Sequence, residues 1–351
     1  MKRYRIAVIP GDGIGQEVVP EGIRVLEAAG SRFGIGFQWQ EFDWSCERYH
    51  ATGRMMPEDG LEQLAGSDGI FLGAVGYPGV ADHVSLWGLL IPIRRRFEQY
   101  ACVRPVRLLP GLQSPLRDAT PGRMDMVIVR ENNEGEYSEI GGRLYQGTDA
   151  EMAVQESVFT RRGVDRILRY AFELARSRRG RLTSATKSNG IIHTMPYWDE
   201  RFAALAAEYP DVETDQYHID ILTAHFVLHP ERFDVVVGSN LFGDILSDLA
   251  AGVAGTIGVA PSANLNPERS HPSMFESVHG SAPDIAGQGI ANPIAQILSG
   301  AMLLEHLGHP DAARAIEAAV ERALQEPKLH TRDMGGATGT AELGAAIVQF
   351  L

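Results

Sequence analysis

The stretch NLFGDILSDL (residues 240–249) directly follows the short apolar run FDVVVG (residues 233–238), a pairing that predicts a buried strand leading into a helix. Residues four apart share one face of a helix, so Asp244 and Asp248 are expected to project side by side. Two such carboxylates repel each other, but a hard divalent cation such as Mg²⁺ or Mn²⁺ would bind both. A solvated acidic face is the alternative, and this stretch alone does not decide between them.

Apolar runs alternate with helical stretches along the rest of the chain, which predicts an α/β architecture. Residues 137–160 differ, because glycines and β-formers alternate there without a helical period, as in an extended arm or hairpin. At 351 residues the chain is long enough for about two domains, although no linker marks a boundary. Strands are expected at residues 4–9, 69–75, 126–130 and 181–185, and helices at 16–29 (closing at Gly30), 163–176, 196–209, 291–307 and 310–324.

Composition narrows the class of protein. Apolar content of 44% and charged content of 22% are typical of a soluble globular protein, and a net charge of -13 argues against nucleic acid or anionic membrane as a partner. The only cysteines, Cys46 and Cys102, suit a reducing compartment. The first apolar run is cut at Pro10, and no later one approaches the ~20 residues that span a bilayer. We therefore expect a cytoplasmic protein.

A basic island interrupts this acidic chain. It consists of Arg94, Arg95, Arg96, Arg104 and Arg107. Such an island is either a solvated helix face or an anion-binding site, and the spacing alone does not choose between the two.

Two glycine-rich segments are candidates for a cofactor site. PGDGIG (residues 10–15) lies between a predicted strand and helix, but it matches neither the dinucleotide fingerprint nor a P-loop. A tight turn with positive φ explains its glycines as well. ESVHGSAPDIAG (residues 276–287) is rich in small residues, and its Asp284 could accept hydrogen bonds from a ribose. A surface loop whose aspartate caps a turn remains the alternative.

Four motifs, in this order, resemble the β-decarboxylating dehydrogenases, a family that includes isopropylmalate, isocitrate and homoisocitrate dehydrogenases. They are IPGDGIG (9–15), RENNEGEY (130–137), NLFGDILSD (240–248) and HGSAPDIAG (279–287). The resemblance runs from residue 6 to the C-terminus. Further segments resemble the tartrate dehydrogenase/D-malate dehydrogenase branch: DWSC (43–46), GYP (76–78), DHVSLWG (82–88), SATKSNG (184–190) and YHIDIL (217–222).

The resemblance implies an isopropylmalate dehydrogenase-like fold of two α/β lobes that share a central sheet without Rossmann topology. Residues 1–100 and 258–351 would form a discontinuous first lobe that binds the cofactor. Residues 101–257 would form a second lobe with the metal ligands and the dimer interface. It also implies a homodimer with shared active sites, in which the arm at residues 137–160 clasps the partner.

The expected chemistry is oxidation of a 2-hydroxy acid followed by loss of a β-carboxylate as CO₂. Arg94, Arg104 and Arg130 match the substrate arginines of the family, and forked guanidinium groups suit carboxylates. Arg95 and Arg96 have no such match and are expected to be solvated charges.

The metal and proton-transfer residues also follow from the resemblance. Asp244 and Asp248 match two metal ligands, and Asp220, supplied by the other subunit, matches the third. Lys187, also from the other subunit, matches the general base, whose pKa must fall from about 10.4 towards neutrality. Tyr137 matches the acid that protonates the enol carbon.

NAD is the expected cofactor, because an aspartate at position 284 suits a free ribose diol and repels the 2′-phosphate of NADP. The resemblance also admits K⁺ as an assisting cation beside Mg²⁺ or Mn²⁺. The residues expected to bind NAD are Glu276, His279, Gly280, Ser281, Ala282, Pro283, Asp284, Ile285 and Asn292.

Substrate choice is expected to depend on the residues just before Arg94. Isopropylmalate enzymes have a glutamate where this chain has Trp87, and Leu90 and Ile91 lie nearby. A bulky indole would fill the space that an isopropyl group needs, which favours small C4 hydroxy diacids. The reactions implied are D-malate to pyruvate and CO₂, tartrate to oxaloglycolate, and meso-tartrate to D-glycerate.

Three alternatives stay open at this point. The first is a 3-isopropylmalate dehydrogenase with an unusual pocket. The second is a binding or regulatory homologue that has lost catalysis, although every catalytic group is present. The third is a metal-dependent hydrolase that uses the aspartates alone, against which the segment around Asp284 argues.

Overall fold

The computed structural model describes residues 2–351, which form two compact units. Unit 1 contains the described residues up to Gln99 together with Arg104–Met124 and Ala250–Leu351, and unit 2 contains Tyr100–Val103 and Asp125–Leu249. Unit 1 is therefore built from both ends of the chain.

These boundaries correct the expected ones, because residues 104–124 and 250–257 belong to unit 1 rather than to the second lobe. The reason is packing. Leu109 is buried in the same hydrophobic core as Val259 and Ala263. At Gly111 an added Cβ would come within 1.9 Å of the Leu324 carbonyl oxygen, so this segment runs directly against unit 1 backbone.

Unit 1 contains a mixed sheet with strand order β2-β1-β3-β12-β11. Strand β1 pairs in parallel with β2 and β3, β12 is parallel to β3, and β11 runs antiparallel to its neighbour β12. Strand β4 (Ala101–Arg107) contributes residues to both units. The other bounds are Lys2–Gly11 for β1, Ile35–Glu41 for β2, Gly69–Ala74 for β3, Pro261–Leu265 for β11 and Met274–Ser277 for β12.

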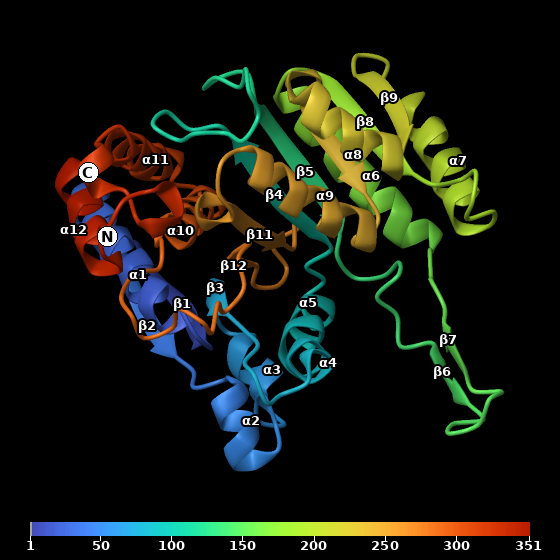
Figure 1. Ribbon diagram of the computed structural model, residues 1–351, viewed down its shortest axis with the longest axis horizontal. Helices are drawn as coiled ribbons and strands as arrows, with labels where there is room; N and C mark the ends of the chain where they lie inside the picture. Colours follow the sequence, from blue (N-terminus) through green and yellow to red (C-terminus); the bar gives the residue numbers. More distant parts are fainter. Residues whose placement is uncertain (1) are drawn as a thin grey trace. The chain divides into compact units, whose positions relative to one another are not determined.

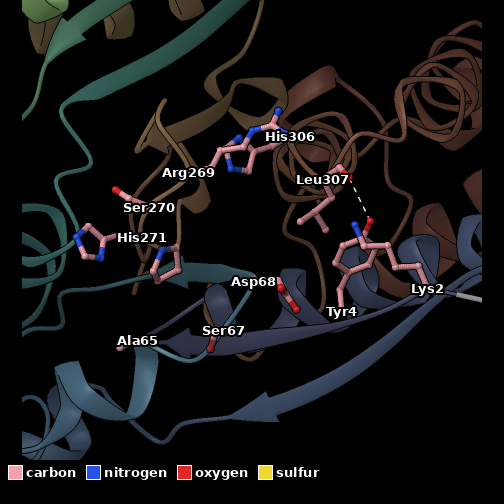
Figure 2. Close-up of a pocket in the computed structure, with 11 residues that line it drawn as sticks. Lys2, Tyr4, Ala65, Ser67, Asp68, Arg269, Ser270, His271, His306 and Leu307 are labelled. Carbon is pink, nitrogen blue, oxygen red and sulfur yellow. Dashed lines mark hydrogen bonds between the residues drawn. The ribbon is translucent and has the colours of Figure 1, made fainter.

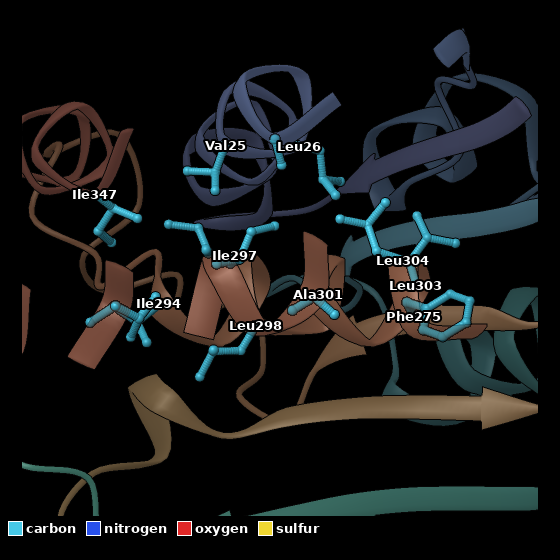
Figure 3. Close-up of a cluster of buried hydrophobic side chains, with 14 of the residues drawn as sticks. Val25, Leu26, Phe275, Ile294, Ile297, Leu298, Ala301, Leu303, Leu304 and Ile347 are labelled. Carbon is cyan, nitrogen blue, oxygen red and sulfur yellow. The ribbon is translucent and has the colours of Figure 1, made fainter. Parts of the chain in front are cut away.

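Helix α10 (Ile294–His306) is the centre of the unit 1 core. It contacts α1 (Gly15–Phe33) as well as β11 and β12, and Figure 3 shows Ile297 facing Val25 of α1 while Leu298 points toward the sheet. Helices α11 (Pro310–Leu324) and α12 (Thr340–Phe350) complete this layer. The shorter helices are α2 (Cys46–Thr52), α3 (Gly60–Leu64), α4 (Asp82–Ser85), the π-helical turn η1 (Leu86–Leu90) and α5 (Ile91–Arg96).

Unit 2 contains four parallel strands in the order β5-β10-β8-β9. The hairpin expected within residues 137–160 is confirmed, since β6 (Gly141–Leu144) pairs antiparallel with β7 (Met152–Gln155), while its role as an arm that clasps a partner stays a prediction. Every residue of β6 and β7 is exposed, and the hairpin stands away from the helices of its unit (Figure 1). The remaining bounds are Asp125–Glu131 (β5), Val235–Gly238 (β10), Arg181–Thr186 (β8), Glu213–His218 (β9), Arg161–Ser177 (α6), Thr194–Ala206 (α7), Ile219–Leu228 (α8) and Asn240–Val253 (α9).

The expected strands and helices are confirmed, but three helix ends differ from the expected ones. Helix α7 ends at Ala206 rather than at residue 209, and α10 begins at Ile294 rather than at residue 291. Helix α1 does not close at Gly30 but continues to Phe33 and ends at Gly34, whose φ of 71° is left-handed. Gly30 is needed for close approach instead, because an added Cβ would come within 2.7 Å of the Ile35 carbonyl oxygen. Within residues 2–351, no helix has both the length and the apolar character needed to cross a membrane.

Candidate active site

The end of β5 and the start of α9 bring together a buried charged group in unit 2. Arg130 is 2% exposed, and its Nε and Nη2 donate to Oδ1 of Asn240 at 3.1 and 2.6 Å. Its Nη1 donates to Oδ1 of Asp244. This approach requires Gly243, where an added Cβ would lie 2.5 Å from Cβ of Arg130.

Asp244 is shared between two donors. Its Oδ1 pairs with Arg130, and its Oδ2 accepts a hydrogen bond of 3.0 Å from the Tyr137 hydroxyl. The Arg130 guanidinium also lies 5.4 Å from the centre of the Tyr137 ring. The structure thus brings together Arg130, expected to bind the substrate, Asp244, expected to bind a metal, and Tyr137, expected to donate a proton.

Glu136 fixes the N-terminal end of α9. Its carboxylate accepts hydrogen bonds from the Ser239 hydroxyl at 2.7 Å and from the backbone N–H of Leu241 at 3.0 Å. A negative charge at this end of a helix satisfies unpaired N–H groups and complements the helix dipole. This anchor sets the position of Asp244 one turn later.

Lys187 and Asp220 form a second pair in the same unit. Lys187 follows β8 and Asp220 lies in the first turn of α8, and the Lys187 Nζ is 2.9 Å from Oδ2 of Asp220. The hydrogen bond and charge of Lys187 lower the pKa of the exposed Asp220 carboxyl. A base and a metal ligand that were both expected to act in the partner's site therefore adjoin within one chain.

Asp248 is exposed one helical turn after Asp244, on the same face of α9. Within residues 2–351 of one chain, no three side chains of the His, Cys, Asp or Glu type are close enough to hold a metal together. The oxygen donors of Asp244 and Asp248 nevertheless have the chemistry that Mg²⁺ and Mn²⁺ prefer, so this pair fits part of a divalent site.

In unit 1, Arg94 is buried and paired with a residue that the sequence assigned elsewhere. Its Nη2 lies 2.8 Å from Oε1 of Glu276, an oxygen that also accepts from Asn264 Nδ2 at 2.6 Å. Both members of the ion pair are less than 10% exposed. Glu276 was expected to bind the cofactor, and its observed contact is with Arg94, an arginine expected to bind the substrate. Arg104, also buried, reaches the Ser262 hydroxyl at 3.4 Å.

Trp87 and Leu90 lie in the π-helical turn η1, directly before Ile91 and Arg94 in α5. Such turns are rare and concentrate at functional sites. The guanidinium of Arg95 lies 4.9 Å from the centre of the Trp87 ring. Arg95 was expected to be a solvated charge, and this expectation is incomplete. The Arg95 guanidinium packs on the Trp87 indole and restricts the position of that ring.

The two glycine-rich segments, weak as separate signals, pack against each other. The Ser281 carbonyl accepts from Ile14 N–H at 2.8 Å, and the Glu17 carboxylate accepts from the N–H groups of Gly287 and Gly289 at 2.6 and 2.7 Å. Gly13 has a φ of 56°, and a Cβ there would come within 2.0 Å of the Ser281 carbonyl oxygen. The glycine loop therefore shapes the loop that carries Asp284.

The loop that carries Asp284 is exposed around Gly280 and Asp284, and a hydrogen bond holds Asn292, which follows it. Asp284 is exposed, and nothing lies within 4 Å of a Cβ added at Gly280, so a ligand can approach the backbone there. Burial lowers the pKa of His279, which favours a neutral imidazole. Asn292 Nδ2 donates to Asp333 at 3.0 Å. These features fit an adenosine-bearing cofactor.

Several supporting residues were not predicted, namely Asn240, Glu136, Asn264, Glu17 and Asp333. The only sequence feature that could have identified any of them is a place inside one of the family motifs. Asn240 and Glu136 each belong to a motif quoted for another residue, whereas Asp333 lies 41 residues from the side chain it holds.

The chain is similar to known proteins over nearly its whole length. The family described as isocitrate/isopropylmalate dehydrogenase matches residues 5–347. The chain is 59% identical to the D-malate dehydrogenase [decarboxylating] of Escherichia coli (strain K12), over 100% of this chain and 99% of that protein. It is 58% identical to the tartrate dehydrogenase/decarboxylase of Pseudomonas putida, over 99% and 98%. The crystal structure of isocitrate dehydrogenase from Methylococcus capsulatus matches 99% of both chains with a TM-score of 0.89 and 37% identity.

Glu131, next to Arg130, predicts a pH dependence of stability. Burial raises the pKa of its carboxyl to about 7, although it accepts N–H bonds from Asn133 and Glu134. The folded state then holds a proton that the unfolded state releases, so this group makes stability fall as pH rises from about 4.5 to about 7. We expect Glu131→Gln to remove a fall of up to about 3 kcal/mol over that window.

Urea unfolding of both proteins at several pH values between 5 and 7.5 measures this difference. Glu326→Gln, at an exposed position, is the control and should keep the wild-type slope. Parallel pH profiles for the wild type and Glu131→Gln would contradict the assignment.

Proposed function

Because the chain belongs to the isocitrate/isopropylmalate dehydrogenase family, we propose that it is an NAD-dependent and divalent-metal-dependent dehydrogenase that oxidises and decarboxylates small C4 hydroxy diacids such as D-malate and tartrate. The observation that carries the proposal is the cluster in which Asp244 joins buried Arg130 to the Tyr137 hydroxyl. It combines an anion-binding group, a carboxylate for a cation and a proton donor in one place.

Substrate binding is assigned to Arg94, Arg104 and Arg130, all of which are buried. A guanidinium keeps its charge when buried and binds carboxylates through two parallel hydrogen bonds. Glu276 and Asn240 hold Arg94 and Arg130 in fixed orientations before a substrate arrives. Such preorganisation orients a diacid and reduces the entropy lost on binding.

Proton transfer is assigned to Lys187 and Tyr137. Lys187 would take the proton of the substrate hydroxyl as the C–H hydride leaves for the nicotinamide of NAD⁺. Tyr137, held by Asp244, would donate its proton to the carbon that loses CO₂. A divalent cation bound by Asp244, Asp248 and the partner subunit's Asp220 would lower the hydroxyl pKa and stabilise negative charge on that oxygen.

A dimer with shared sites is part of the proposal. Exposed apolar side chains gather in unit 2, a distribution that supports a protein contact there. Ile221, Val227 and Leu228 belong to α8, Ile245 belongs to α9, and Leu144 and Met152 belong to the arm. Association through this face and the arm would carry Asp220 and Lys187 towards a neighbouring copy.

The cofactor and substrate preferences rest on two residues. Asp284 would accept hydrogen bonds from a free ribose diol and repel a 2′-phosphate, which favours NAD over NADP. Trp87, packed against Arg95, would fill the space that an isopropyl group needs. K⁺ is proposed as an assisting cation on the resemblance alone.

A substrate panel tests the proposal. Turnover on D-malate and tartrate isomers should exceed turnover on 3-isopropylmalate, and NAD should be preferred to NADP. NADH formation at 340 nm with Mg²⁺ or Mn²⁺ measures both. A large preference for 3-isopropylmalate would instead establish the alternative dehydrogenase and show the Trp87 argument to be wrong.

The metal assignment predicts that Asp248→Asn loses most metal-dependent turnover, on the order of a hundredfold or more, while the protein stays folded and dimeric. The amide keeps the size of the side chain but removes its charge. Metal titration and size-exclusion chromatography check the two parts. Asp311→Asn, on an exposed carboxylate of α11, is the matched control. Full turnover in Asp248→Asn would refute the ligand set.

Shared sites predict complementation between inactive variants. In a heterodimer of Lys187→Ala and Asp244→Asn chains, one site carries both defects and the other carries none. After subunits are exchanged at random, roughly a quarter of wild-type activity should return. A mixture of Asp244→Asn and Asp248→Asn, whose changes lie on one helix, should recover none. Equal behaviour of the two mixtures would argue against shared sites.

A further inference from the structure

A pocket of about 270 Å³ in unit 1 lies at the end of the sheet opposite to the Asp284 loop. Parallel strands β1, β3 and β12 all begin beside it, and Lys2, Asp68 and Pro272, at or just before their first residues, lie on its lining. The loop follows the far end of β12. Over the ten residues of β1 the two ends are roughly 30 Å apart. The pocket is therefore separate from the cofactor region.

Nitrogen-bearing side chains converge on this pocket. Figure 2 shows Arg269 and His306 beside each other, with Lys2 and His271 also on the lining. Within residues 2–351, the guanidinium of Arg269 forms no ion pair or side-chain hydrogen bond. The ammonium of Lys2 lies over the Tyr4 ring at 4.7 Å. In the described part of the chain neither cation is ion-paired with a carboxylate, although Asp68 also lies on the lining.

The turn that carries Arg269 is held rigidly. Asn266, fully buried, accepts hydrogen bonds through Oδ1 from the N–H groups of Ser270 and His271, at 2.7 and 3.1 Å, and from the Ser270 hydroxyl at 3.0 Å. Arg269 itself has a left-handed φ of 56°, which is uncommon for a residue with a side chain. The rest of the turn keeps this conformation in place, so the backbone position from which the Arg269 side chain extends is fixed.

The electrostatics of the pocket agree with its composition. Burial, and then the nearby positive charge of Arg269, lower the pKa of His306 to about 4, so its imidazole is neutral near pH 7. Asp68 is the one carboxylate on the lining, and its Oδ2 accepts the Arg5 backbone N–H at 2.7 Å. A second positive charge on His306 is therefore disfavoured until a negative ligand is present.

We propose that this pocket binds a small metabolite through an oxyanion, either a phosphate or a carboxylate group, on Arg269 with Lys2, Ser270 and His306 around it. The volume admits a group of this size but not a macromolecule. Cations that converge without a partner carboxylate are the arrangement that oxyanions require. The neutral imidazole of His306 supplies a hydrogen-bond donor beside the charge, whereas the Ser270 hydroxyl already donates to Asn266.

Calorimetric titration of the protein with inorganic phosphate and with citrate, at constant ionic strength, tests this site. Arg269→Gln should weaken binding by roughly fivefold or more. Asp68→Asn should change it in the opposite direction, tightening binding roughly two- to threefold, because a repelling charge is removed. Arg314→Gln, an exposed arginine of α11, is the matched control and should change nothing.

The proposed substrate arginines also attract anions, but they are unaltered in all three variants, so only a difference between isotherms reports on the pocket. Turnover at saturating substrate should stay unchanged in Arg269→Gln, which separates this proposal from the proposed function. If circular dichroism shows that Arg269→Gln is unfolded, the other two variants test the site. Asp68→Asn should then bind the anions more tightly than the wild type, and His306→Gln should bind them more weakly. Tighter binding of phosphate or of citrate identifies the class of ligand. Identical isotherms in the wild type and the folded variants would overturn the proposal.

Discussion

The buried charge of Arg130 is the constraint on which unit 2 depends. A guanidinium that is 2% exposed must be paired, since an unpaired charge in a protein interior costs several kcal/mol. Its partners, Asn240 and Asp244, both lie on α9, one helical turn apart. The pairing therefore fixes α9 against the end of β5, and Gly243 is the residue that permits the approach.

Under the proposed function, the same pairing would couple the binding of cation and substrate. In the chain by itself, Asp244 neutralises Arg130. If Asp244 takes a share of a divalent cation, it offers less charge to Arg130, and cation and guanidinium repel each other. A substrate carboxylate on Arg130 compensates for both effects. The electrostatics thus favour the cation and the diacid together over either one alone, which suits a reaction that needs both.

Much of this arrangement could be predicted from the sequence because it is local. The spacing of Asp244 and Asp248 fixes a shared helix face, and the apolar run before them fixes a parallel strand. Family motifs identified Arg130, Lys187 and Tyr137, whose contacts are now explicit. What the sequence did not indicate are partners that only topology brings together. Glu276 meets Arg94 across 182 residues, so neither periodicity nor motif spacing connects them.

The sequence also did not indicate the boundary of unit 1 or the residues that meet at its pocket. Residues 104–124 look like a continuation of the second lobe along the chain, and only the burial of Leu109 beside Val259 assigns them to the first. Likewise, Arg269 and His306 are distant in sequence and meet because β12 and α10 pack together. Helix α10 begins two residues after Asn292, which was expected to bind the cofactor, and ends at His306 in the pocket proposed to bind an oxyanion. Its interior is almost entirely buried between α1 and the sheet, so displacement at one end would disturb packing along its length. Any coupling between the two ends of the sheet would therefore have to pass through this helix or through the strands themselves.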